Sequence, residues 1–278
     1  MIDPAERIDR PNYLEPLREE EVPVGSKPRI RVTNTLAVPY RWICQIEVSY
    51  RDPDVRYETR LAQGTGLLIG PRSVLTAAHV LSPRRGREKV DEVIVSPARD
   101  GSGPPPLGSF EAADCKLSPN WLKDHSAEYD FGLIRLAKDV STHRLKTGRL
   151  GYWGDPQYGS GSNLRALAPA EVAGRTINVA GYPEDRSPRK TLWIGTGRIS
   201  GHVPELGIRE KDKLIRHAAP TSGGQSGAPV WLYHKSAGRR DLVGVHTTPV
   251  SRQGAEASAA NLAIRLRPYV LDLLRSWM

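Results

Sequence analysis

Several features that stabilise or anchor specialised proteins are scarce in this 278-residue chain. Its two cysteines, Cys44 and Cys115, are too few for a disulfide framework or a four-ligand zinc site, and we expect both to be free thiols. No run of about 18 apolar residues occurs, so no transmembrane helix is expected. The first thirty residues lack the apolar centre of a secretory signal. A chain of this length can still bury a large core without such support.

Dense charge runs are also missing from the body of the chain. The formal net charge is +9, but the first 21 residues hold seven acidic and three basic side chains, a net of −4, which leaves +13 for the rest. The basic residues of the body are scattered and lack interleaved aromatic residues, which favours a solvated basic surface. We therefore expect no specific nucleic-acid partner. A nucleic-acid-binding protein is the distant alternative, and absence of DNA retention at any salt concentration would exclude it.

The remaining composition favours an all-β protein. Its 26 glycines and 23 prolines suit many short strands joined by tight turns. Pro268 begins a segment whose apolar residues lie on one face, which predicts a short C-terminal helix. The other apolar runs predict strands at 42–48, 66–69, 74–76, 93–95, 131–136, 176–180, 192–199, 228–232 and 242–245.

Three segments are expected along the chain. The acidic stretch 1–21 is predicted to be an arm or prosegment, because it is polar and shows no strand or helix period. The main body divides at residues 151–168, which are rich in glycine, serine and other polar residues and suit a crossing between domains. The predicted domains are therefore 22–150 and 151–278.

One serine has the surroundings of a nucleophile. Ser226 lies in Gly223-Gly224-Gln225-Ser226-Gly227, where the glycines allow a sharp turn and leave room for a substrate carbonyl. The backbone N–H groups of Gly224 and Ser226 are the predicted oxyanion hole. Such a string is common in ordinary turns, so it carries little weight by itself.

A base and an acid are available to activate this serine. His79 follows the strand-like run Leu75-Thr76 and two small alanines, and Asp130 stands at the start of the apolar run 131–136. Each has an ordinary interpretation in isolation, a structural histidine and a turn cap. Together they occur in the order His, Asp, Ser, which is one of three unrelated orders known for catalytic triads.

The strings around His79, Asp130 and Ser226 resemble the three signature motifs of the chymotrypsin-like serine proteases. The resemblance implies two six-stranded antiparallel β-barrels, one carrying His79 and Asp130 and the other Ser226, with the active cleft between them. It also implies a serine endopeptidase that needs no cofactor or metal. A catalytically silent, protease-like binding module is the alternative. It is less favoured because all three catalytic positions are retained.

A narrower resemblance is to the bacterial glutamyl endopeptidases, the V8-like branch. Residues 31–35 and 39–41, 181–183, 221–227 and 245–247 look like segments of that branch. The resemblance implies that Thr221, His246 and Thr247 bind substrate and that the first two hold a glutamate at P1, with aspartate weaker. Trypsin-like relatives have an aspartate where this chain has Pro220, so no counter-ion for lysine or arginine is evident. The alternative is that His246 is a buried strand residue.

The N-terminal region suggests how activity is controlled. Gln225 occupies the position at which trypsin-like zymogens have an aspartate that pairs with a freed N-terminus. Trypsin-style activation is therefore not expected for this chain. The acidic arm ends in Glu19-Glu20-Glu21, and cleavage after Glu21 by the protein itself would release it; a disordered tail is the alternative. The resemblance implies secretion, whereas the sequence as written predicts a cytoplasmic protein unless a leader has been removed.

Overall fold

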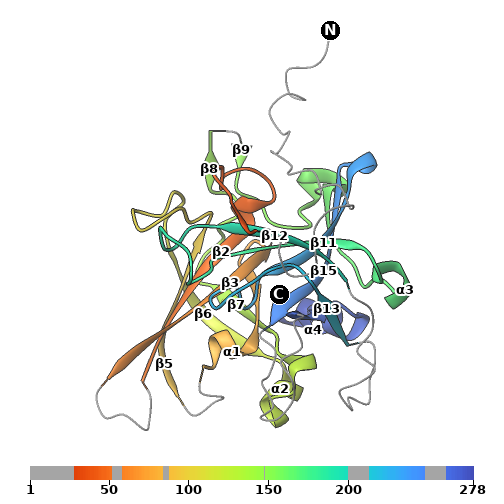
Figure 1. Cartoon of the computed structure of the whole chain (residues 1–278). Helices are drawn as coiled ribbons and strands as arrows, with labels where there is room; N and C mark the ends of the chain where they lie inside the picture. The colour runs from red at the N-terminus through yellow and green to blue at the C-terminus, as the bar shows by residue number, and fades with distance from the viewer. Residues whose placement is uncertain (1–27, 52–57, 84–87, 147, 200–212, 248–260) are drawn as a thin grey trace.

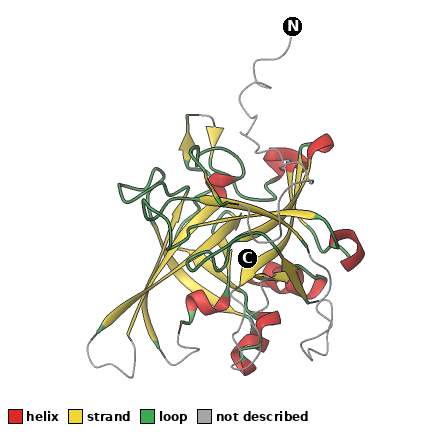
Figure 2. Cartoon of the chain, viewed as in Figure 1, coloured by secondary structure: helices red, strands yellow, loops and turns green. Residues whose placement is uncertain are grey.

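The computed structural model describes residues 28–51, 58–83, 88–146, 148–199, 213–247 and 261–278. Strands dominate these residues, and the helices are short and lie at the periphery of the molecule (Figure 2). Two strand systems lie side by side, one built from the red-to-green part of the chain and the other from the teal-to-blue part (Figure 1). This arrangement confirms the predicted all-β class.

The first strand system is a closed barrel with the order β2-β3-β4-β7-β6-β5, antiparallel throughout. Its apolar side chains form a buried core, and its longest strands β2, β3 and β5 are continuously buried along one half and exposed toward the other end. Closure leaves no unpaired edge. The strands are β2 (Ile43–Arg51), β3 (Thr59–Gly70), β4 (Ser73–Thr76), β5 (Lys89–Pro97), β6 (Phe110–Leu117) and β7 (Gly132–Leu136).

The second strand system is a curled sheet with the order β12-β11-β14-β15-β16-β13. Its end strands meet through a bridge between Ile199 and His217 and a hydrogen bond from the Ala218 N–H to the Arg198 carbonyl (2.9 Å). Six strands therefore form a nearly closed barrel, held at the seam by few bonds. They are β11 (Thr176–Gly181), β12 (Trp193–Arg198), β13 (Leu214–His217), β14 (Pro229–His234), β15 (Arg239–Thr247) and β16 (Asn261–Arg265).

Short strands and helices lie outside the two barrels or extend them. β1 (Ile30–Arg31) pairs antiparallel with β12, and β10 (Ser162–Leu164) pairs parallel with β15, an exception to the antiparallel pattern expected. β8 (Arg144–Leu145) and β9 (Gly148–Arg149) form a small hairpin. The α-helices are α1 (Ala78–Leu81), α2 (Pro119–Asp124), α3 (Pro169–Val172) and α4 (Pro268–Trp277); the 3-10 turns are η2 (Tyr40–Trp42), η3 (Ala127–Tyr129), η4 (Pro156–Gly161) and η5 (Lys235–Ala237).

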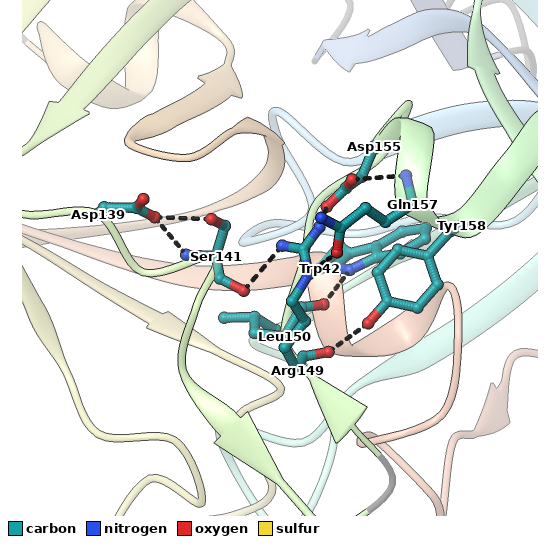
Figure 3. Close-up of polar contacts among 8 residues, drawn as sticks. All are labelled: Trp42, Asp139, Ser141, Arg149, Leu150, Asp155, Gln157 and Tyr158. Atoms are coloured by element: carbon teal, nitrogen blue, oxygen red, sulfur yellow. Dashed lines mark hydrogen bonds and ion pairs between the residues drawn. The ribbon is translucent and has the colours of Figure 1, made fainter.

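The crossing between the barrels is fixed by aromatic and ionic contacts (Figure 3). The Trp42 indole N–H donates to the Leu150 carbonyl (2.7 Å), and Arg149 forms an ion pair with the buried Asp155 (2.6 Å). The Trp153 ring packs edge-on against Trp42, with 6.1 Å between centroids, and against a tryptophan of β14. These contacts join the first barrel, the crossing and the second barrel into one core.

The first and last elements of the described residues, β1 and α4, each pack on the barrel other than the one that the predicted domain boundaries imply. β1 belongs to the predicted segment 22–150 but extends the second sheet. The C-terminal helix α4 was grouped with 151–278 but packs on the first barrel, where Trp277 lies 6.0 Å from the Phe131 ring. The boundaries at 150 and 151 stay predictions, whereas the terminal elements tie the two barrels together.

Two smaller expectations can be compared with the described residues. Cys44 and Cys115 are both free, as predicted; Cys44 is fully buried and Cys115 is partly exposed. The longest helix among the described residues, α4, has ten residues, so none of those helices is long and apolar enough to cross a membrane.

Candidate active site

Strand pairing brings His79 and Asp130 together across 51 residues of chain. β4 pairs with β7, with Thr76 opposite Gly132, so the residues just beyond these positions meet at one edge of the first barrel. The His79 ring Nδ1 lies 2.6 Å from Asp130 Oδ2, and the His79 backbone N–H donates to Oδ1 at 2.8 Å. Because a carboxylate accepts, this contact places the ring proton on Nδ1 and leaves Nε2 as the acceptor.

The Asp130 side chain is buried, and both of its carboxylate oxygens accept hydrogen bonds. Besides the two bonds from His79, its Oδ2 accepts a hydrogen bond from the Thr247 hydroxyl at 2.6 Å. Burial by itself would raise the pKa of Asp130, but the hydrogen bond and charge attraction of His79, followed by the bond from Thr247, bring the pKa below its ordinary value. The carboxylate is therefore ionised at neutral pH and can stabilise a cationic imidazole.

The loop that carries Ser226 connects β13 to β14 and presses against the segment leading to His79. Gly224 and Gly227 have φ values of +84° and +85°, a left-handed conformation that glycine adopts without strain. A Cβ added at Gly227 would lie 2.9 Å from the backbone nitrogen of Ala77, two residues before His79. The serine loop and the histidine segment are thus in direct contact across the two barrels.

Thr65 of β3 holds the same loop from the first barrel. Its backbone N–H donates to the Ser226 carbonyl and its hydroxyl to the Gly224 carbonyl, both at 2.8 Å. The Thr65 carbonyl in turn accepts from the Thr76 hydroxyl at 2.8 Å. Thr65 is fully buried, so these bonds are protected from water. This role could not be predicted from the sequence, because the contact joins residues 159 positions apart.

The predicted substrate-binding residues have different surroundings. Thr221 is partly exposed, whereas His246 of β15 is 3% exposed and Thr247 is fully buried. The hydroxyl of Thr247 donates its hydrogen bond to Asp130. The predicted contact between Thr247 and substrate stays a prediction. The structure places the Thr247 hydroxyl against the Asp130 carboxylate, a contact that sequence reasoning did not anticipate.

His246 has a neighbour that sequence reasoning overlooked. The His217 ring of β13 packs edge-on against the His246 ring, with 5.4 Å between centroids. Burial lowers the pKa of His217 to about 4 and that of His246 well below the ordinary 6.5, so both rings are neutral at pH 7. No sequence pattern marked His217, because its short strand was not predicted; in the structure His217 is buried on the same face of β13 as Ile215.

Comparison with known proteins identifies the family. A family model described as a trypsin-like peptidase domain matches residues 64–245, which include His79, Asp130 and Ser226. A glutamyl endopeptidase of Bacillus licheniformis is 30% identical over 255 residues, covering 91% of this chain and 68% of the relative. The chain belongs to the trypsin-like peptidase family. It is a serine endopeptidase, as the resemblance in the sequence had implied.

Further relatives support the same fold. A solved structure of a Glu endopeptidase in complex with MPD superimposes with a TM-score of 0.67 at 20% identity, covering 92% of this chain and 99% of that one. A Bacillus subtilis protein named extracellular metalloprotease is 26% identical over 91% of this chain and 69% of its own length. Among the described residues of this peptidase, no cluster of three or more His, Cys, Asp or Glu could hold a metal ion.

Proposed function

We propose that this peptidase cleaves polypeptides with a triad of Ser226, His79 and Asp130. His79 Nε2 takes the proton of the Ser226 hydroxyl as Oγ bonds to the substrate carbonyl carbon. The carbonyl oxygen becomes an oxyanion, and Asp130 stays ionised and stabilises the imidazolium. His79 then gives its proton to the departing amine as the C–N bond breaks. Water then bonds to the acyl carbon as His79 takes its proton, and His79 returns that proton to Ser226 Oγ as the ester bond breaks and the new carboxyl product leaves.

The contact that carries this proposal is the pair of hydrogen bonds from His79 to Asp130. It sets the tautomer that a general base needs, and the packing of Gly227 against Ala77 supports the approach of the serine loop. The N–H groups of Gly224 and Ser226 are proposed to stabilise the oxyanion. The left-handed Gly224 and the grip of Thr65 on the loop support that role, because preorganised donors need a rigid backbone.

We further propose that glutamate is the preferred residue at P1, with aspartate weaker. Pro220 offers no counter-ion for a basic side chain, whereas the Thr221 hydroxyl and an N–H of the His246 ring can donate to a carboxylate. Relatives named glutamyl endopeptidase support this preference. Hydrogen bonds to a charged group contribute about 1.5–3 kcal/mol each.

The preference predicts how His246 affects different substrates. In His246→Phe, a ring of similar shape keeps the packing on His217 but cannot donate, so kcat/KM for a P1-Glu peptide should fall about 10- to 100-fold. A matched P1-Gln peptide should be affected less, since it carries no charge. The exposed His143→Phe is the control and should leave both rates unchanged.

Kinetics on a panel of peptides that differ only at P1 provide the measurement. Equal or better cleavage after Phe or Arg by the wild-type enzyme would refute the P1 assignment. An equal loss for Glu and Gln peptides in His246→Phe would make His246 a buried strand residue with no part in recognition.

We also propose that the enzyme removes its own acidic arm after Glu21, a site outside the described residues. An acid-directed protease should accept this Glu-rich sequence, and Pro23 at P2′ would slow the cut without preventing it. Intact-mass spectrometry of purified wild type should show loss of residues 1–21, and Ser226→Ala should keep them. Identical N-termini in the two preparations would reject self-processing.

A further inference from the structure

A buried arginine lies behind the serine loop. Arg29 immediately precedes β1, and the pairing of Ile30 with Ile194 and the bond from the Val32 N–H to the Leu192 carbonyl (2.8 Å) fix this segment on the second barrel. Only 6% of the Arg29 side chain is exposed. A guanidinium buried to this degree is tolerated only where acceptors surround it, so its partners reveal what it holds in place.

Within the described part of the chain, the Arg29 side chain has three polar partners, and each belongs to the serine loop or touches it. Nη1 donates to the Ser222 hydroxyl oxygen at 2.6 Å and to Gln225 Oε1 at 3.1 Å. Nη2 forms an ion pair with Asp185, in the loop between β11 and β12. The Ser222 hydroxyl donates to the same Asp185 carboxylate at 2.6 Å. The guanidinium, the hydroxyl and the carboxylate thus form a closed ring of polar contacts.

These contacts act on the residues that shape the nucleophile turn. Gln225, which directly precedes Ser226, is fully buried, and its Oε1 also accepts from the Ser222 backbone N–H at 3.0 Å. The Gln225 N–H closes the turn on the Ser222 carbonyl at 3.1 Å. Arg29 therefore fixes the Gln225 side chain and the first residue of the turn, while Thr65 holds the carbonyls of Gly224 and Ser226.

We propose that Arg29 is a positioning residue that, together with Thr65, sets the serine loop in its catalytic geometry. This inference rests on the proposed role of Ser226 as nucleophile. The planar fork of a guanidinium can serve Gln225, Ser222 and Asp185 at once, which the single point charge of a lysine cannot. Because Arg29 lies beyond Glu21 in the chain, the support is present before and after removal of residues 1–21.

The proposal is tested by steady-state kinetics and melting temperatures of Arg29→Ala, Arg29→Lys and Asp185→Asn. We expect Arg29→Ala to lower kcat about 10- to 100-fold, as a misplaced reacting group does, while KM changes less than about threefold. Arg29→Lys should recover only part of that loss. Asp185→Asn, an exposed change that leaves the core intact, should lower kcat about three- to tenfold through its weaker hold on Arg29.

Two controls separate positioning from general stability. Arg31→Ala removes an exposed arginine two residues away that pairs with Asp100 at 2.9 Å, and should leave kcat unchanged. Ethylguanidinium added to Arg29→Ala should restore part of kcat, because it can refill the vacated space between Gln225 and Asp185. A purely structural role would not produce this rescue.

The outcomes are distinguishable. If Arg29→Ala and Asp185→Asn keep kcat within twofold of wild type below their melting temperatures, Arg29 only anchors the N-terminal strand and the proposal fails. The proposal is also overturned if Arg29→Ala lowers kcat but ethylguanidinium does not restore it and Asp185→Asn keeps the wild-type kcat. If Ser226→Ala retains wild-type activity, the proposed function itself is wrong, whatever the Arg29 variants do.

Discussion

Replacing Asp130 by asparagine should lower kcat about 10⁴-fold while the protein still folds, the loss expected when a serine protease loses control of its histidine tautomer. Asp130 Oδ2 now accepts from His79 Nδ1, and Oδ1 accepts from the His79 backbone N–H. An amide cannot accept at both positions. If the NH₂ group of asparagine faces His79 Nδ1, it favours the tautomer that carries the ring proton on Nε2. In that tautomer Nε2 cannot accept the proton of Ser226.

Thr247→Val is the matched control for this change. It removes one hydrogen bond to Asp130 but leaves both bonds from His79, so kcat should fall only about tenfold. Steady-state kinetics at pH 7 and thermal melting of both variants provide the check. An Asp130→Asn enzyme within about tenfold of wild type would show that Asp130 does not set the tautomer of His79.

Gly227→Ala should be among the most damaging single substitutions in the chain. A Cβ at this position would lie 2.1 Å from the Thr65 carbonyl oxygen and 2.2 Å from the Thr76 hydroxyl, in the middle of the hydrogen bond that joins them. The backbone φ of +85° adds further strain. Together, overpacking and left-handed strain should lower the free energy of unfolding by about 3–5 kcal/mol. Hydrolysis should be lost with the loop geometry.

Gly101→Ala isolates the backbone contribution to that loss. Gly101 has a nearly identical φ of +83°, but a Cβ there would meet no atom within 4 Å. The control should cost about 1–2 kcal/mol and leave activity unchanged. Urea unfolding of both variants gives the comparison. If Gly227→Ala were no more destabilising than Gly101→Ala, the contact between the serine loop and the histidine segment would be looser than the structure shows.

The strands with continuous apolar patterns could be predicted because their burial follows directly from their side chains. β4 and β7 were expected at nearly their observed positions, and Asp130 stands just before β7; His79, expected directly after a strand, lies in the short helix α1 that follows β4. β6 was not predicted, because its sequence FEAADCKL mixes charged and apolar residues and its burial is partial. β13 and β16 were not predicted, because arginine, histidine and asparagine interrupt the apolar residues in their sequences LIRH and NLAIR.

The contacts that hold the site rigid could not be predicted from the sequence. Arg29 meets Gln225 across 196 residues, and Thr65 meets Gly224 across 159. No local pattern marks either residue, since a lone arginine or threonine is usually exposed. Motifs identify the groups that react because chemistry restricts their types and order. The groups that support them are chosen by three-dimensional proximity alone.

The reactivity of Ser226 provides the most direct measurement of the triad. A fluorophosphonate probe should label the wild-type protein, and peptide mapping by mass spectrometry should locate one adduct on the Ser226 hydroxyl. Ser226→Ala should not be labelled, and His79→Ala should react at least about 10³-fold more slowly because the general base is gone. Folded wild-type protein that resists the probe, or an adduct on another residue, would contradict the proposed triad and favour a catalytically silent binding module.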